Sequence, residues 1–230
     1  MIIPKIKFPF YGVCLILSII VGILYIVMSL KKEGFKGKGL VYFGLFLLFN
    51  IVVFGKVFTI LTSSKNYNFL NAGFSSYGCL IGVMVSALLF ENLLQAKGKV
   101  IKYSVLSLPL IYSIGKLGCF IAGCCNGIPY KGLFYVVYPD RLNIPQFPIQ
   151  IVESIVFIIL FFILNKFKNK NNIVYIAAIS GVLLKFLLEF LRYNHVSKIL
   201  TVNQIFSIIL IIGIIVFYFI KKKKNGDINE

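Results

Sequence analysis

The chain has 230 residues, of which 59% are hydrophobic and 13% are charged, and its mean hydropathy is +0.94. This composition excludes a water-soluble globular domain, because too few polar side chains remain to cover its surface. The formal net charge of +17 does not indicate a nucleic-acid-binding protein, because the basic residues stand in short clusters between long apolar runs. That pattern is typical of membrane topology.

Seven apolar segments follow one another, each near the roughly 20 residues that cross a bilayer. Because backbone groups in lipid must hydrogen-bond internally, each segment is predicted to be a helix. The first is predicted to be a retained helix, since it is too long for the apolar region of a signal peptide and lacks a small-x-small cleavage site. The predicted helices of this all-α membrane domain, residues 1–230, are 10–30, 40–62, 76–95, 103–124, 148–165, 173–191 and 202–220.

The basic residues between the helices predict the orientation of the chain. One side holds twice as many as the other, and the positive-inside rule places the richer side in the cytoplasm. The N-terminus and the longest loop, 125–147, are therefore expected outside, and the C-terminus inside. The richer side comprises the clusters within 31–38, 97–102, 166–170 and 221–224. The other side holds Lys5, Lys7, Lys65, Lys131, Arg141, Arg192 and Lys198.

Ionisable side chains within or beside the predicted helices are candidate functional residues, because a charge at mid-membrane costs roughly 2.5–3.5 kcal/mol. For Lys56 and Glu91 a structural role is favoured, since each can reach an interface. Lys185, Glu189 and Arg192 share one helix face through i, i+4 and i, i+3 spacings. A structural ion pair would explain two of them, whereas a polar cavity facing outward, which we favour, would explain all three.

Two other segments also carry candidate residues. Gln150 and Glu153 share a face at the start of the fifth predicted helix, where they are either interfacial or part of a site. The segment 115–127 combines glycines, which permit close approach of a helix or ligand, with Lys116 and three cysteines. These cysteines are interpreted as small buried apolar residues. Their C-x4-C-C spacing lacks the C-x2-C pairs typical of zinc sites, so no metal is expected.

Six motifs follow one another along nearly the whole chain: Phe10–Gly12, Tyr77–Gly82, Gly115–Gly127, Phe147–Glu153, Lys185–Arg192 and Val202–Ile208. Together they resemble the motifs of the bacterial prolipoprotein diacylglyceryl transferase family. The corresponding family patterns are aromatic-Tyr-Gly, His-Gly-Gly-Leu-Ile-Gly, Gly-Arg-Ile-Gly-Asn-Phe-x-Asn-x-Glu-x-x-Gly, His-Pro-x-Gln-Leu-Tyr-Glu, Arg-x-x-x-Glu-Phe-x-Arg and Met-Gly-Gln-x-Leu-Ser. The chain resembles a divergent, cysteine-bearing branch of that family.

Several family positions are substituted. Tyr77 and Phe147 stand where the family has histidine, Lys116 and Lys185 where it has arginine, Cys119 where it has asparagine, and Cys124 where it has glutamate. His195, the single histidine, falls in the predicted loop after the sixth helix, so no histidine base is expected for a thiol. The retained residues are Tyr11, Gly127, Gln150, Glu153, Glu189 and Arg192.

The resemblance implies a multi-pass enzyme of the bacterial cell membrane, without a cofactor, that moves a diacylglyceryl group from phosphatidylglycerol to a cysteine thiol of a lipoprotein precursor. Its implied partners are phosphatidylglycerol, the precursor's signal peptide and membrane lipid. The alternative is a divergent relative that acts on another lipid or thiol acceptor, or a membrane binding protein without catalysis. The resemblance implies catalytic roles for Tyr77, Lys116, Lys185 and Glu189. It implies substrate-binding roles for Tyr11, Gly78, Cys119, Gly127, Gln150, Glu153 and Arg192.

Overall fold

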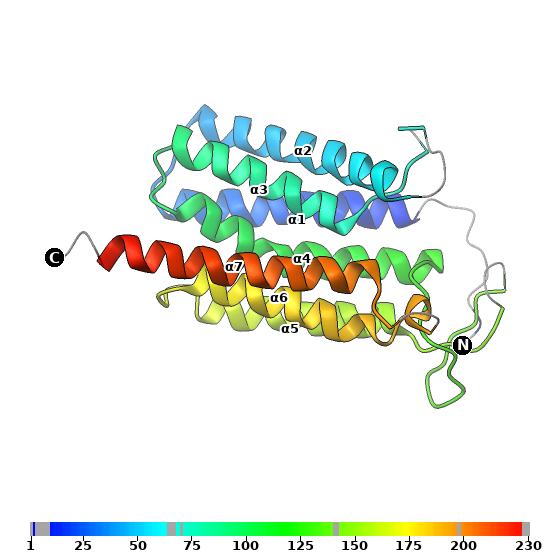
Figure 1. Ribbon diagram of the computed structural model, residues 1–230. Coiled ribbons are helices and arrows are strands. Elements are labelled where there is room, and N and C mark those ends of the chain that lie inside the picture. The colour runs from blue at the N-terminus through cyan, green and yellow to red at the C-terminus, as the bar shows by residue number, and fades with distance from the viewer. Residues whose placement is uncertain are drawn as a thin grey trace. The chain divides into compact units, whose positions relative to one another are not determined.

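The computed structural model describes residue 2 and residues 10–63, 68–69, 71–139, 143–196 and 199–226. Within these residues it contains seven α-helices and one short 3-10 helix, and the only extended pairing is a few isolated bridges (Figure 1). The helices are α1 (Phe10–Lys32), α2 (Lys38–Thr62), α3 (Ser76–Leu93), α4 (Lys99–Ala122), α5 (Ile149–Lys166), α6 (Ile173–Glu189) and α7 (Val202–Gly226), with the 3-10 helix η1 (Tyr193–His195) before α7. Five basic residues used for the predicted orientation lie outside the described residues: Lys5, Lys7, Lys65, Arg141 and Lys198.

The all-helical fold class is confirmed. Among the described helices, six are long and apolar enough to cross a membrane, and the remaining one, α6, has 17 residues. The predicted boundaries were wrong at two places: α4 begins at Lys99 rather than near residue 103, and α7 continues to Gly226 rather than ending near 220. In both cases the helix extends into a lysine cluster, because lysine forms helix readily and its long side chain can reach water from a helix end.

The chain forms two compact units, which are described separately. One unit comprises Ile16–Tyr112, and the other comprises the residues up to Leu15 together with Ser113–Glu230. The predicted single domain, 1–230, stays a prediction.

In the unit Ile16–Tyr112, α2 packs closely against α3 through small residues. A side chain at Gly78 would overlap the backbone carbonyl of Phe54, and one at Gly82 would overlap that of Asn50. The pair Gly78 and Gly82, four residues apart, is the small-xxx-small pattern that lets helix backbones approach in membranes. Beside it, Asn50 Nδ2 donates a buried hydrogen bond of 3.0 Å to Ser86 Oγ, which fixes the register of the two helices.

Replacing Gly82 by alanine is therefore expected to lower the melting temperature in detergent, because the new methyl group would push α2 away from α3. The matched control is Gly181→Ala in α6, where a methyl group would meet open space. There the change should raise stability, since alanine is about 1 kcal/mol better than glycine inside a helix. Shifts of the same sign in both variants would contradict the close α2–α3 packing.

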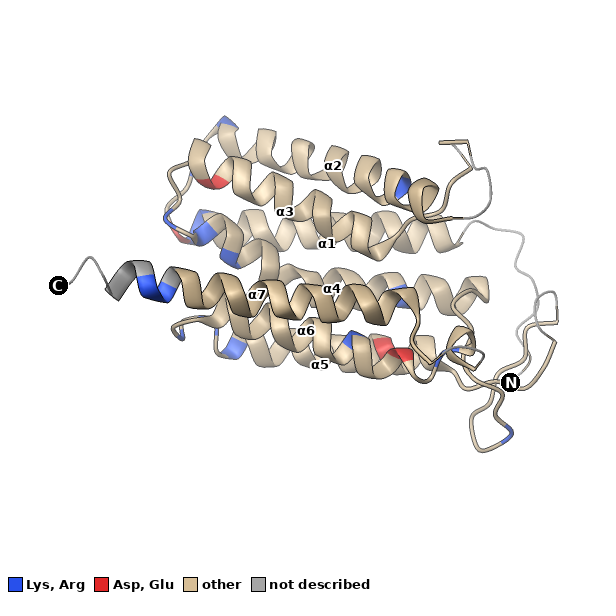
Figure 2. Cartoon of the chain, in the orientation of Figure 1, with Lys and Arg blue, Asp and Glu red and all other residues tan. Residues whose placement is uncertain are grey.

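Most charged residues of this unit gather at the end that carries the α1–α2 and α3–α4 connections, whereas α2 carries one basic segment near its other end (Figure 2). Lys99 Nζ lies 2.8 Å from Glu33 Oε2, and the hydrogen bonds from Lys99 and Tyr103 lower the pKa of Glu33. Glu91 accepts hydrogen bonds from the backbone N–H groups of Gly98 and Ile101 at the start of α4. The Lys56 ammonium donates to the Phe69 carbonyl at 2.9 Å. These contacts agree with the structural roles favoured for Glu91 and Lys56, which stay predictions.

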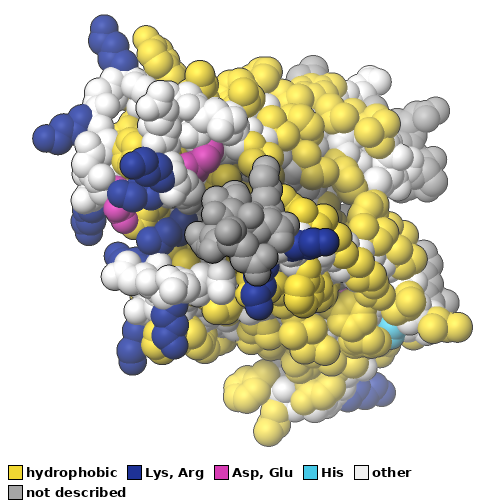
Figure 3. All heavy atoms as spheres, turned by 60° about the vertical axis from the view of Figure 1, so that its left-hand side comes forward, with side chains coloured by type: hydrophobic (Ala, Val, Ile, Leu, Met, Phe, Trp, Pro, Cys, Tyr) yellow, Lys and Arg dark blue, Asp and Glu magenta, His cyan; other side chains and the backbone are white. Residues whose placement is uncertain are grey.

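In the unit that contains Ser113–Glu230, α6 packs against α7 and α5. Ser113 Oγ in α4 donates to the Ser154 carbonyl of α5 at 2.8 Å, which ties α4 to α5 inside the bundle. The lysines of the α5–α6 connection and of the end of α7 lie at the same end of this unit (Figure 2). Apolar side chains cover most of the sides of the helices (Figure 3), as expected of a multi-pass membrane protein whose solvent is lipid.

Candidate functional site

Glu153 is the centre of a buried ion network. Its side chain, on the first turns of α5, is 0% exposed. Lys116 of α4 places Nζ 2.9 Å from Glu153 Oε2, and Arg192, which follows α6, places Nη2 2.6 Å from Glu153 Oε1. Three segments far apart in sequence therefore converge on one carboxylate. The two positive charges offset the cost of burying it, which would be several kcal/mol for an unpaired ion.

Arg192 also joins Glu153 to Glu189, because its Nε lies 3.2 Å from Glu189 Oε2. The other oxygen of Glu189 accepts hydrogen bonds from Asn203 Nδ2 at 2.7 Å and from Thr201 Oγ1 at 3.3 Å. Glu189 is 1% exposed, so these partners replace the water that the carboxylate has lost.

Thr201 and Asn203 were missed by the sequence analysis as site residues, although the sequence contains a signal for them. Thr201 Oγ1 accepts from the Gln204 N–H at 3.2 Å, and Gln204 Oε1 accepts from the Thr201 N–H at 2.9 Å. This reciprocal pair is a capping box, T-x-x-Q, which is a recognisable start of a helix. It fixes the first turn of α7 and so holds Thr201 and Asn203 against Glu189.

Lys185, one turn before Glu189 on α6, is partly buried and interacts electrostatically with all four charged residues of the network. The ion pairs thus bring together four of the predicted residues, Lys116, Glu153, Glu189 and Arg192, and Lys185 lies one turn from Glu189 on the same helix. The group combines three basic and two acidic side chains inside the bundle. Protein encloses the four paired side chains, with exposures of 7% or less, so the predicted water-accessible cavity stays a prediction.

Backbone pairing holds Arg192 in place. The Tyr193 N–H donates to the Asn126 carbonyl at 2.9 Å, and the Ile128 N–H donates to the Leu191 carbonyl at 3.0 Å. Gly127 lies between these bonds, where a side chain would overlap the Phe147 carbonyl. The structure therefore explains Gly127 by close backbone approach, and its predicted contact with substrate stays a prediction.

Gln150 and Tyr11 are two further predicted substrate-binding residues in this unit. Gln150 is 0% exposed and donates from Nε2 to the Cys124 carbonyl at 2.8 Å. Its Oε1 has no hydrogen-bond partner among the described residues. Such an orphaned buried acceptor is rare in proteins. The backbone of Tyr11, in the first turn of α1, lies close to Gly118 of α4.

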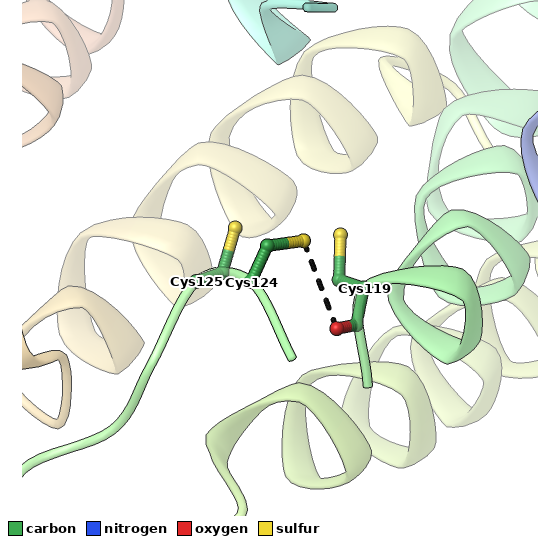
Figure 4. Close-up of side chains that lie close together, drawn as sticks. All are labelled: Cys119, Cys124 and Cys125. Carbon is green, nitrogen blue, oxygen red and sulfur yellow. Dashed lines mark hydrogen bonds between the residues drawn. The ribbon is translucent and has the colours of Figure 1, made fainter. Parts of the chain in front are cut away.

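The three cysteines of the segment 115–127 lie side by side (Figure 4). Cys119 is in the last turn of α4, and Cys124 and Cys125 are in the loop that follows. Their sulfur atoms all lie within 4.8 Å of one another, and all three residues are free cysteines.

Tyr77 and Gly78 belong to the unit Ile16–Tyr112, so their predicted roles at the site stay predictions. Tyr77 is 6% exposed and its ring packs near that of Phe58, with 6.5 Å between the centroids.

The chain is similar to known proteins over nearly its whole length. The sequence model of the prolipoprotein diacylglyceryl transferase family matches residues 1–220. A relative from Clostridium perfringens named phosphatidylglycerol–prolipoprotein diacylglyceryl transferase 2 is 28% identical over 94% of this chain and 91% of its own length. Proteins named phosphatidylglycerol–prolipoprotein diacylglyceryl transferase from Clostridium tetani and Clostridioides difficile are 29% and 25% identical, over 90% and 96% of this chain and 91% and 94% of theirs. The chain therefore belongs to the prolipoprotein diacylglyceryl transferase family.

Proposed function

We propose that this protein transfers a diacylglyceryl group from phosphatidylglycerol to the cysteine thiol of a lipoprotein precursor in the bacterial plasma membrane. The names of its relatives support this reaction. The observation that carries it in the structure is the buried ion network of Lys116, Glu153, Glu189 and Arg192.

The reaction breaks the bond between the glyceryl carbon and the phosphate oxygen, and the electron pair of that bond stays on the phosphate. Negative charge therefore grows on the leaving glycerol phosphate, and a fixed cation in a dry site stabilises it far more than a cation in water would. Lys116, Lys185 and Arg192 supply that charge. Glu153 and Glu189 hold Arg192 in a fixed orientation, so it needs no reorganisation during the reaction.

The orphaned Gln150 Oε1 provides a hydrogen-bond acceptor one helical turn from Glu153. The glycerol headgroup of phosphatidylglycerol carries hydroxyl donors, so we assign Gln150 to headgroup recognition. A site built to accept such a hydrogen bond discriminates against lipids that lack the donor, since the buried oxygen would then stay unpaired.

The proposal includes seven membrane spans with the N-terminus outside and the C-terminus in the cytoplasm. Six helices meet the length and hydropathy of a span, and the lysine clusters of each unit lie at one end of that unit. Reporter fusions test it: a fusion at Asn225 is expected to report the cytoplasm, and one at Lys131 the outside. The same compartment for both fusions would contradict the seven-span topology.

Lys185→Ala is expected to reduce the transfer rate by about 100-fold, which is typical for loss of one group that stabilises a transition-state charge. The substitution removes the basic group that stands beside the ion network on α6. Lys185→Arg preserves the positive charge and restores the arginine of the family pattern, so it should keep most of the activity. Initial rates of purified variants in the same lipid would show the difference, and equal losses in both variants would argue against a charge role.

The function is tested directly by expressing this protein in a bacterial strain depleted of its own diacylglyceryl transferase. Restored growth and restored lipidation of a reporter lipoprotein are expected. The control is the same reporter with serine at the acceptor position, which should stay unmodified. If the protein reaches the membrane but the reporter remains unlipidated, the alternative of another acceptor or a non-catalytic binding role is favoured.

A further inference from the structure

The reaction proposed above assigns no role to the three neighbouring cysteines at the end of α4, which form a cysteine cluster. Cys119, Cys124 and Cys125 present three sulfur atoms within 4.8 Å of one another (Figure 4). The other two cysteines, Cys14 and Cys79, are not part of this group. Free cysteines pack as small apolar residues, but their thiols also bind metals.

The end of α4 explains how a C-x4-C-C spacing closes into a cluster. Gly123 has a left-handed φ of 64°, its N–H donates to the Phe120 carbonyl at 3.3 Å, and the Cys124 N–H donates to the Cys119 carbonyl at 3.1 Å. These two bonds form a Schellman motif, which brings the residue after the left-handed glycine back onto the last turn of the helix. Cys124 is thereby folded against Cys119.

Further contacts hold the cluster in place. Cys124 Sγ contacts the Cys119 carbonyl at 3.6 Å, and Gln150 Nε2 holds the Cys124 carbonyl from α5 at 2.8 Å. Cys125 follows in a left-handed conformation with φ 58°, which places its sulfur on the same side. The absence of a C-x2-C pair therefore does not exclude a metal site here. The turn at the end of α4 brings the cysteines together, as the C-x2-C spacing does in zinc sites.

The cluster has the chemistry of a thiophilic metal site. Thiolates are preferred ligands of Zn²⁺, and a catalytic zinc site has three protein ligands and one open position. Sulfur atoms around a tetrahedral Zn²⁺ are about 3.8 Å apart, given Zn–S distances of about 2.3 Å. The three sulfur atoms, all within 4.8 Å of one another, are close to that spacing.

We propose that Cys119, Cys124 and Cys125 bind one Zn²⁺ as thiolates and that the fourth position accepts the thiol of the lipoprotein precursor. This inference rests on the proposed transferase function. The acceptor thiol loses its proton when it binds the metal, since a coordinated thiol is deprotonated. Its sulfur then forms a bond to the glyceryl carbon, the carbon–oxygen bond to phosphate breaks, and the released phosphate monoester takes up the proton. The zinc site would thus replace the base that is absent where Tyr77 occupies the family's histidine position.

Metal binding is tested on the purified, reduced full-length protein with Cd²⁺, whose bonds to thiolates produce a charge-transfer absorption. One Cd²⁺ per chain is expected to give a charge-transfer absorption of the intensity expected for three thiolate ligands. Added Zn²⁺ should displace the Cd²⁺ and abolish this absorption. The double variant Cys124→Ser/Cys125→Ser should lose this band. The matched control Cys14→Ser/Cys79→Ser removes the same number of thiols and should keep it. An unchanged band in the first variant would overturn the site.

A second measurement uses the unmutated protein and so does not depend on how a variant folds. Alkylation of each cysteine is followed by mass spectrometry with and without Zn²⁺. At free Zn²⁺ about ten times its Kd, Cys119, Cys124 and Cys125 should be modified about tenfold more slowly, as mass action requires. Cys14 and Cys79 should be unaffected. Equal protection of all five cysteines, or a Cys119–Cys124 disulfide in the protein isolated from membranes, would overturn the proposal.

The open position is tested by adding a lipobox peptide to the Cd²⁺-loaded protein. A peptide with the acceptor cysteine should increase the charge-transfer band by about one third, because a fourth thiolate completes the tetrahedron. The serine version of the peptide should leave the band unchanged, and equal responses to both peptides would overturn acceptor binding. Failure of the zinc site appears as absent metal binding while transfer proceeds, whereas failure of the proposed function appears as absent transfer while metal binding persists.

Discussion

Replacing Glu153 by glutamine is expected to abolish transfer and to destabilise the fold by about 3–5 kcal/mol, which is the usual effect of removing one partner from a buried ion network. Glutamine has the same shape but no charge. It would leave Lys116, at 6% exposure, and Arg192, at 7% exposure, close together without the carboxylate that separates them. The measurements are thermal unfolding in detergent and the initial transfer rate of the membrane-reconstituted variant.

The matched control is Glu91→Gln. Glu91 also lies in a helix, but it accepts backbone hydrogen bonds at the start of α4 and is partly exposed. Its loss is expected to resemble the loss of a helix cap, about 1 kcal/mol. Similar melting temperatures for the two variants would show that the buried ion network does not stabilise the fold more than the hydrogen bonds of Glu91 do.

Arg192→Lys is expected to lower the transfer rate by about 100-fold, comparable to the loss of a fixed transition-state donor. Arg192 binds Glu153 through Nη2 and Glu189 through Nε. The single ammonium of lysine cannot reproduce this two-sided contact, although it preserves the charge. Glu189 would keep Thr201 and Asn203 as partners, so the fold should survive better than in Glu153→Gln.

A lysine-to-arginine substitution at position 116 is the control, because it also keeps the positive charge while changing the shape of the side chain. Lys116→Arg introduces the arginine of the family pattern at a position that contacts Glu153 alone among the ion pairs described. It is expected to retain or increase the transfer rate. A fully active Arg192→Lys variant would show that the bridge between the two carboxylates is dispensable.

Much of the fold and part of the site could be predicted from the sequence. Apolar length predicts the helices because lipid leaves the backbone no other partner. The cost of a buried charge likewise singled out Glu153, Lys185 and Glu189 before any contact was known. Which carboxylate binds which cation was not predictable, because it depends on how α4, α5 and the segment after α6 meet.

The clustering of Cys119, Cys124 and Cys125 was not predictable from their spacing alone. It depends on the left-handed turn at Gly123, which reverses the chain at the end of α4. A glycine that follows a helix is a recognisable signal for such a turn. The T-x-x-Q box that places Thr201 against Glu189 was recognisable in the same way, but its consequence required the position of α6.

The most direct test is diacylglyceryl transfer by the purified protein itself. Phosphatidylglycerol labelled in its diacylglyceryl group is supplied in mixed micelles with a peptide that carries a lipobox cysteine, and a relative of established activity is assayed in parallel. The proposed function predicts a labelled thioether on the cysteine peptide, no product on the serine peptide, and release of glycerol phosphate in equal amount. No labelled peptide from this protein, while the relative is active under the same conditions, would contradict the account.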